Sequence, residues 1–108
     1  MDKTYRECGD GWKKLIDPLE VEVERLGGTV SQIKEKYGGL RFYYSPGDST
    51  ADLHPDWDIV ENMVDDAEQQ SLVTCEMCGQ PGVLMTSGHW LKTLCADDAL
   101  QLGYKKRA

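Results

Sequence analysis

The chain has 108 residues, a formal net charge of −7 and four cysteines. Its hydrophobic fraction of 40% and charged fraction of 29% are ordinary for a globular domain. It contains no apolar run long enough to span a membrane, and its N-terminus lacks the pattern of a secretion signal. We therefore expect a cytoplasmic protein that does not contact a membrane. The length predicts one domain, with an α+β core in residues 1–72 and a zinc-binding module in residues 73–108.

Apolar residues recur at helical spacing over residues 12–26, which predicts the first helix. Pro18 interrupts this pattern and leaves two interpretations open. The helix either begins near Gly11 and is kinked at the proline, or begins anew with Asp17 as its N-cap and the proline at its first position. The two glycines that follow are expected to end the helix, and the segment before it is expected to be irregular.

Residues 29–45 form two β-prone runs that Gly38 and Gly39 join, and this pattern predicts a β-hairpin. Three basic residues lie among its tyrosines: Lys34, Lys36 and Arg41. Cations beside aromatic rings can bind the phosphates and bases of a nucleic acid. The alternative interpretation is a sheet with one core face and one solvated, charged face, which the acidic surroundings favour.

A second helix is predicted over residues 56–71, with Asp56 as its N-cap. Its expected buried face consists of Trp57, Val60, Met63 or Val64, Ala67 and Ser71. Its opposite face carries five carboxylates: Asp58, Glu61, Asp65, Asp66 and Glu68. Because several of these lie three or four residues apart, their repulsion opposes helix formation, and packing of the buried face must hold the helix.

Acidic residues dominate the first two thirds of the chain. Residues 1–70 hold 8 basic and 16 acidic side chains, a sum of −8, whereas residues 71–108 hold 4 and 3, a sum of +1. Such a surface repels the backbone of a nucleic acid and attracts a basic partner. The candidate partner-binding residues are Asp58, Glu61, Asp65 and Asp66. The alternative interpretation is that these carboxylates only keep the protein in solution.

The C-terminal third carries the spacing of a metal site. Cys75 and Cys78 form a Cys-x-x-Cys pair that Gly79 follows, and this glycine allows the tight turn that points both sulfurs at one ion. A third cysteine, Cys95, comes after a predicted hairpin, and Asp98 stands three residues beyond it. Positions i and i+3 share one face of a helix, so both side chains can meet the same ion. We predict that the three thiols and this carboxylate bind a structural Zn²⁺.

The segments around these ligands predict a hairpin over residues 83–94 and a short helix over residues 96–103. A knuckle, a hairpin and ligands at the start of a helix form the order of a treble-clef or zinc-ribbon-like module. His89 is the rival fourth ligand, because imidazole suits zinc well, and Asp97 is a third option. The basic tail, residues 104–107, is expected to fray.

Catalytic motifs are missing from the sequence. A zinc deaminase would show His-x-Glu before Pro-Cys-x-x-Cys, a nucleotide-binding enzyme would show a glycine-rich phosphate loop, and neither pattern is present. We therefore expect no enzymatic activity. A zinc-dependent hydrolase or nuclease that uses His89 or Asp97 as a base is the least favoured class.

Two stretches carry a resemblance: IKEKYGGLRFYY at 33–44, and TCEMCGQPG followed by GHWLKTLCADDA within 74–99. Together they resemble a group of small uncharacterised proteins from bacteriophages and prophages, which pair a KEK(Y/F)GGLRFY hairpin with a C-terminal Cys-x-x-Cys zinc knuckle. In that group the second ligand pair is often Cys-x-x-His. This chain has Cys95 and Asp98 at those positions, which supports position 98 as a ligand. The resemblance implies a phage or prophage context and brings no established activity.

The fold expected from these patterns is α+β: helix, β-hairpin, helix, then the small zinc module. The expected function is that of a non-enzymatic, zinc-stabilised phage accessory protein that binds an unidentified host or phage protein in the host cytoplasm. In its sharper form, the acidic face inhibits a host defence or nucleic-acid enzyme. The alternative is a nucleic-acid-binding regulatory zinc protein that uses Lys34, Lys36, Arg41, Lys92 and the basic tail.

Overall fold

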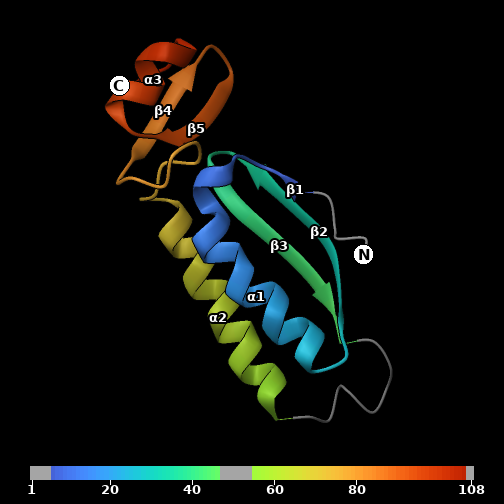
Figure 1. The fold of residues 1–108 in the computed structure, drawn as a ribbon. Helices are drawn as coiled ribbons and strands as arrows, with labels where there is room; N and C mark the ends of the chain where they lie inside the picture. Colours follow the sequence, from blue (N-terminus) through green and yellow to red (C-terminus); the bar gives the residue numbers. More distant parts are fainter. Residues whose placement is uncertain (1–5, 47–54, 107–108) are drawn as a thin grey trace.

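A computed structural model describes residues 6–46 and 55–106 of the chain (Figure 1). The described residues contain three α-helices, one 3₁₀ turn and two three-stranded sheets, which confirms the predicted α+β class. The first sheet and the two long helices form the main body, residues 6–46 and 55–73. The second sheet and the shortest helix form the C-terminal module, residues 74–106, at one end of the main body. No helix in the described ranges is long and apolar enough to cross a bilayer.

The first helix, α1, spans Lys13–Arg25 and continues from the 3₁₀ turn η1, Asp10–Trp12. Pro18 lies inside α1, so the continuous helix is the right interpretation and the fresh start at Asp17 is wrong. The proline is exposed, and water can bind the carbonyl that loses its helical partner there. The buried side of the helix matches the predicted spacing: Trp12, Ile16, Leu19 and Val23.

Strands β2 (Thr29–Lys36) and β3 (Gly39–Ser45) form the predicted hairpin, but its turn is displaced by one residue. The register makes Tyr37 and Gly38 the two turn residues, with φ of 54° and 86°. Two consecutive positive φ angles give the type I′ turn that matches the twist of a hairpin. Gly39 opens β3 instead of turning the chain.

The N-terminal segment contains a strand, which contradicts the prediction of an irregular start. Strand β1, Arg6–Glu7, pairs in parallel with β2. The guanidinium of Arg6 donates to Asp17 at 2.7 Å and also pairs with Glu20. Because both carboxylates belong to α1, these ion pairs tie the strand to the helix. A strand of two residues has no periodicity that a sequence could reveal.

The second helix, α2, spans Asp56–Ser71 as predicted. Its buried side chains are Trp57, Val60, Val64, Ala67 and Ser71. Val64 therefore takes the core position for which Met63 was the alternative. Asp56 is the first helical residue rather than the N-cap, a position that Pro55 takes. The carboxylate of Asp56 instead lies 3.2 Å from the guanidinium of Arg25 on α1.

Helix α2 also covers the free edge of β3. The sheet order is β1-β2-β3, which leaves the outer backbone groups of β3 without a neighbouring strand. The Ser71 hydroxyl accepts the N–H of Leu40 at 2.9 Å, and the Glu68 carboxylate accepts the N–H of Phe42 at 3.1 Å. The carboxylate of Glu68 therefore binds the edge of β3, and its predicted position on the solvent-exposed face of the helix is wrong.

One apolar cluster joins both helices to one face of the sheet. Its buried members are Trp12, Ile16, Leu19, Val23, Ile33, Leu40, Phe42, Trp57, Val60, Val64 and Ala67. Tyr44 stacks on Trp57 at the far end, with ring centroids 5.7 Å apart. The helices lie on this face, and none of the described elements covers the opposite face of the sheet (Figure 1).

The C-terminal module contains the predicted hairpin and short helix. Its elements are β4 (Val83–Ser87), β5 (Trp90–Leu94), α3 (Ala96–Leu102) and β6 (Lys105–Lys106). The turn between β4 and β5 consists of Gly88 and His89, because Ser87 pairs with Trp90. Strand β6 pairs with β4, so the described part of the tail forms a third strand and does not fray as predicted. Arg107 lies outside the described residues.

Candidate metal centre

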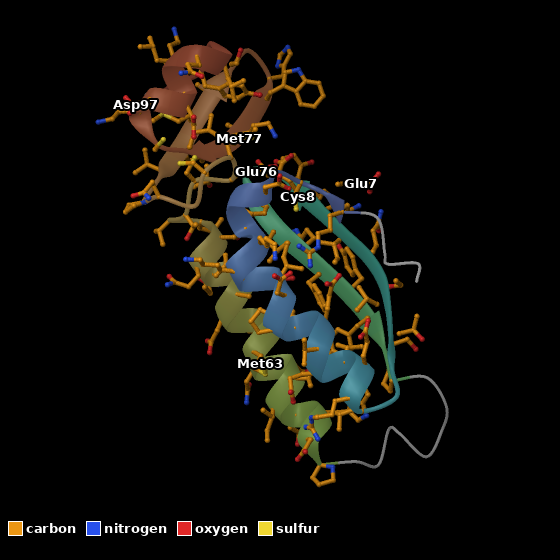
Figure 2. The ribbon with its side chains drawn as sticks, in the orientation of Figure 1. Glu7, Cys8, Met63, Glu76, Met77 and Asp97 are labelled. Carbon is orange, nitrogen blue, oxygen red and sulfur yellow. The ribbon has the colours of Figure 1, made fainter. Side chains whose placement is uncertain are left out.

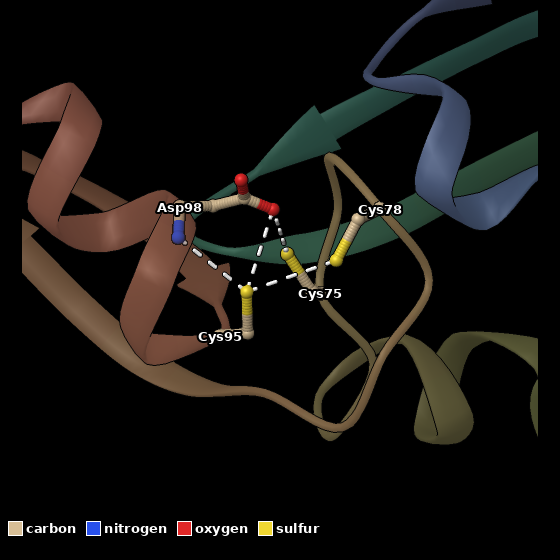
Figure 3. A group of neighbouring side chains, drawn as sticks. All are labelled: Cys75, Cys78, Cys95 and Asp98. Carbon is tan, nitrogen blue, oxygen red and sulfur yellow. Dashed lines mark hydrogen bonds between the residues drawn. The ribbon is translucent and has the colours of Figure 1, made fainter.

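Four side chains of the C-terminal module converge on one point (Figure 3): Cys75, Cys78, Cys95 and Asp98. One ligand atom from each lies within 4.8 Å of the others. The sulfurs of Cys78 and Cys95 are 3.7 Å apart, and Oδ2 of Asp98 lies 3.2 Å from Cys75 Sγ and 3.4 Å from Cys95 Sγ. The four predicted ligands are therefore together, and this group could hold a metal ion.

The first ligand pair is shaped by a tight turn. The N–H of Gly79 donates to the carbonyl of Cys75 at 2.9 Å, and the N–H of Cys75 donates to the carbonyl of Gln80 at 2.6 Å. Gly79 has the expected positive φ, 84°. A Cβ at this position would also lie 3.1 Å from the carbonyl oxygen of Gly11. The turn therefore requires glycine both for its backbone angle and for its contact with the main body.

The second ligand pair is set by the start of α3. Cys95 is the N-cap of this helix, and its sulfur accepts the backbone N–H of Asp98 at 3.4 Å. This local hydrogen bond places the cysteine and the aspartate on one side of the first helical turn. A small apolar cluster lies beside the site: Cys75, Met85, Leu94 and Ala99.

The four groups differ in exposure, and the crowding shifts the pKa of Cys78 and of Asp98. Cys75 is buried, Cys78 is exposed, and the other two are half-buried. The backbone N–H of Gln80 lowers the pKa of Cys78, but the Asp98 carboxylate and the two neighbouring thiols outweigh it and raise this pKa to about 12. Hydrogen bonds from the thiols, that of Cys78 first, lower the pKa of Asp98. A metal bound here would displace the thiol protons of its ligands.

The rival ligands do not belong to this group. His89 lies exposed in the turn between β4 and β5, whereas Cys95 follows the other end of β5. Asp97 is exposed on α3 (Figure 2). Neither residue is among the four whose ligand atoms gather within 4.8 Å in the described part of the chain.

The residues of the two predicted macromolecular surfaces lie elsewhere. The predicted partner-binding residues are all exposed on α2 of the main body: Asp58, Glu61, Asp65 and Asp66. Lys34 and Arg41 are paired directly across β2 and β3. Lys92 does not join them, because its ammonium lies 3.2 Å from Glu76 and 3.8 Å from Glu35.

Sequence reasoning missed Glu76, which joins the metal turn to the main body (Figure 2). It is only 2% exposed, its carboxylate accepts the N–H of Gly9 at 2.9 Å, and its backbone carbonyl accepts the N–H of Gly11 at 2.6 Å. Its own N–H donates to the carbonyl of Thr93, whose hydroxyl donates to the carbonyl of Gly38 at 2.7 Å. The signal available in the sequence was an acidic residue inside a Cys-x-x-Cys pair with a distant lysine to neutralise it.

Comparisons of this chain with protein-family models, with curated proteins and with solved structures find no match. Function is therefore inferred from the metal centre, from the surfaces of the main body and from their chemistry.

Proposed function

We propose that the protein is a non-enzymatic binding protein whose C-terminal module is stabilised by a structural Zn²⁺. The observation that carries this proposal is the convergence of four protein donors within 4.8 Å. A structural zinc ion takes four protein ligands, whereas a catalytic one keeps a position open for water. Four donors fill the tetrahedron and leave no place for an activated water. The order of turn, hairpin and helix start supports a treble-clef-like arrangement for the module.

The donor types and their spacing favour zinc over other cations. Thiolates bind zinc readily, whereas Mg²⁺ and Ca²⁺ prefer oxygen ligands. In a tetrahedron with Zn–S bonds of about 2.3 Å, two sulfurs lie about 3.8 Å apart. The sulfurs of Cys78 and Cys95 are 3.7 Å apart. A sulfur and a carboxylate oxygen would lie about 3.5 Å apart, and the two contacts of Asp98 measure 3.2 and 3.4 Å.

A metal assay tests the ligand set. We expect the purified protein to contain one equivalent of zinc by elemental analysis. Asp98→Ala should lower the zinc affinity at least about tenfold, because even the loss of groups that only support a ligand weakens zinc binding by that factor. His89→Ala should leave the affinity unchanged, and the reverse outcome would make His89 the fourth ligand. Protein that folds without metal and binds none would contradict the zinc proposal.

The proposed activity is capture of a basic protein partner in a phage-infected or lysogenic host. The contact surface is the acidic face, defined as Asp58, Glu61, Asp65 and Asp66. All four side chains are exposed, and the opposite side of α2 is held by the main apolar cluster. The helix therefore presents carboxylates whose number and position do not depend on the metal. In the sharper form of the proposal, these carboxylates occupy the phosphate-binding surface of a host defence or nucleic-acid enzyme.

The experiment is affinity capture from a bacterial lysate with two matched variants. The test variant neutralises the acidic face: Asp58→Asn, Glu61→Gln, Asp65→Asn and Asp66→Asn. The control variant removes the same charge from exposed positions elsewhere: Glu7→Gln, Asp10→Asn, Glu24→Gln and Asp97→Asn. We expect the wild type and the control to capture the same basic protein, and the test variant to lose it while its circular dichroism stays unchanged. Undiminished capture by the test variant would contradict the assignment of the acidic face as the contact surface.

A further inference from the structure

The face of the first sheet that points away from the helices carries cations and an aromatic ring. Its side chains, here called the open face, are Gln32, Lys34, Lys36, Arg41 and Tyr43. They alternate along the strands with Ile33 and Phe42, which are buried under the helices. Lys34 lies directly opposite Arg41. Like charges at paired positions repel each other. Glu7, the partner of Lys34 on β1, offsets part of this repulsion, and an anion bound beside Arg41 would offset the rest.

The three cations of the open face, like Lys14, Lys105 and Lys106, belong to the described cations that form no salt bridge. Arg6, Lys13, Arg25 and Lys92 each form a salt bridge with a carboxylate. Within the described part of the chain, none of the three cations of the open face does. Instead, the ammonium of Lys34 lies 5.8 Å from the centre of the Tyr43 ring, and that of Lys36 lies 5.5 Å from the centre of the Tyr37 ring. One carboxylate, Glu7, shares this face: it is the register partner of Lys34 on β1, and it lies 3.4 Å from the amide of Gln32.

At the end of β2 the open face leads into a cleft between the two hairpin turns. The cleft has a volume of about 260 Å³ and is lined by Glu35, Lys36, Tyr37, His89, Trp90 and Leu91. Tyr37 and Trp90 are 70% and 74% exposed, so both present ring surface to solvent. Tyr37 adopts the left-handed backbone region, which bulky residues rarely occupy. Lys36 belongs to both the open face and the cleft and makes them one continuous surface.

We propose that the open face and this cleft bind a short single strand of nucleic acid. Lys34, Lys36 and Arg41 would hold its phosphates, while Tyr37, Tyr43 and Trp90 would stack on its bases. Cations interleaved with exposed rings are the usual means of binding single strands without sequence preference. A duplex hides the base faces that such rings require. The excess negative charge on the rest of the protein repels a polyanion and confines the strand to this surface.

This surface shares no residue with the acidic face, so the two proposals can fail independently. A protein that uses one face for a nucleic acid and another for a basic partner can bring the two together. The nucleic-acid test therefore uses the intact, zinc-loaded chain and purified oligonucleotides, with no lysate and no partner protein.

Tryptophan fluorescence gives a local readout of binding. Trp12 and Trp57 are only 0% and 8% exposed, whereas Trp90 is 74% exposed. We expect an unlabelled thymidine oligonucleotide of about eight nucleotides to quench the fluorescence at about 50 mM salt. Trp90→Phe should lose most of this quenching and still bind a fluorescein-labelled oligonucleotide in an anisotropy assay. Trp90→Ala should weaken binding by about fivefold or more, because it removes a stacking ring.

A charge-matched pair of variants tests the cations. Lys34→Gln with Arg41→Gln should weaken binding at least about tenfold and make the slope of log affinity against log salt shallower by about 1.4, or about 0.7 per phosphate contact. The control is Lys105→Gln with Lys106→Gln, which makes the same charge change on β6. It should weaken binding by less than about twofold, because neither lysine lines the cleft and β4 separates β6 from β5.

Three results would each overturn the proposal. The first is neither quenching nor anisotropy change with single-stranded DNA or RNA at low salt, the outcome expected if this surface takes a protein instead. The second is an equal loss of affinity in the two charge-matched variants. The third is a duplex that binds as tightly as the single strand.

Discussion

The main body and the C-terminal module differ in how many apolar side chains they bury. The main body buries a cluster of eleven hydrophobic residues, including two tryptophans and a phenylalanine. The module buries four, and one of these is the ligand Cys75. The stabilisation from apolar burial scales with the number and size of such side chains. The core of the module is therefore too small to fold it without another source of stability. With the proposed zinc ion, one part of the chain would fold by apolar packing and the other by metal coordination.

Removal of the metal should produce the largest difference in stability between the two regions. Zinc coordination contributes on the order of 10 kcal/mol to the folding of small zinc modules. We expect a strong chelator, or Cys95→Ser, to expose the amides of β4, β5 and α3 to rapid hydrogen exchange, while the amides of α1 and α2 stay protected. Mass spectrometry of peptides after exchange measures both regions at once. Simultaneous loss of protection in both would show that the chain is one cooperative unit.

A cavity in the main body should have the next largest effect. Leu19 is 2% exposed in the centre of the apolar cluster, so Leu19→Ala should lower the free energy of unfolding by about 2–5 kcal/mol. Val21 on the same helix is 61% exposed, and Val21→Ala should change it by less than about 0.5 kcal/mol. Urea denaturation of the zinc-loaded proteins, followed by the fluorescence of the buried tryptophans, provides the measurement. Similar midpoints for the two variants would contradict the assignment of the core.

The junction tests how far the two regions support each other. Glu76 is buried and pairs with Lys92 while it accepts the N–H of Gly9. Glu76→Gln removes the charge but keeps the shape, and should lower the free energy of unfolding by about 1–3 kcal/mol because it leaves Lys92 half-buried with Glu35 alone. Glu24→Gln, on the exposed side of α1, is the control and should be neutral. An unchanged free energy of unfolding in Glu76→Gln would mean that the two regions do not stabilise each other through this residue.

The smallest expected effect is a loss of stability at alkaline pH. Burial, followed by the charge of Glu76, raises the pKa of Cys8 from 9.0 to about 11. The folded protein then holds a proton that the unfolded chain releases, so stability is full below about pH 9 and falls as pH rises towards 11. We expect the melting temperature of the zinc-loaded protein to fall between pH 8.5 and 10.5, and to fall less in Cys8→Ser. An identical pH profile in that variant would rule out Cys8 as the source.

Periodic segments were predictable from the sequence, and long-range contacts were not. The apolar spacing located α1 and α2 and both hairpins, because burial on one face repeats along the chain. Strands β1 and β6 were missed, since a two-residue strand exists only through its partner. Glu68 was placed on the wrong face because its carboxylate serves the backbone of β3, a contact that helical periodicity cannot show.

The metal centre was predictable for a similar reason. Cys75 and Cys78, like Cys95 and Asp98, are local pairs whose spacing brings their side chains together within a single turn. The spacing ranked Asp98 ahead of His89 but did not exclude His89, because the choice depends on the second hairpin: His89 lies in the turn before β5, whereas Asp98 lies on α3, beyond the other end of that strand. The role of Glu76 was also hidden, because its partners come from the N-terminal segment and from β5.

The cleft between the hairpin turns is shared between the two regions: Tyr37 belongs to the main body, and His89 and Trp90 belong to the module. A ligand that contacts both walls binds only the state in which the module is ordered against the main body. The proposed zinc ion would favour the same state. Linkage is reciprocal, so the metal and any such ligand must raise each other's affinity by the same factor. Through the cleft, binding of the ligand would therefore depend on zinc, and the affinity for zinc would depend on the ligand to the same degree.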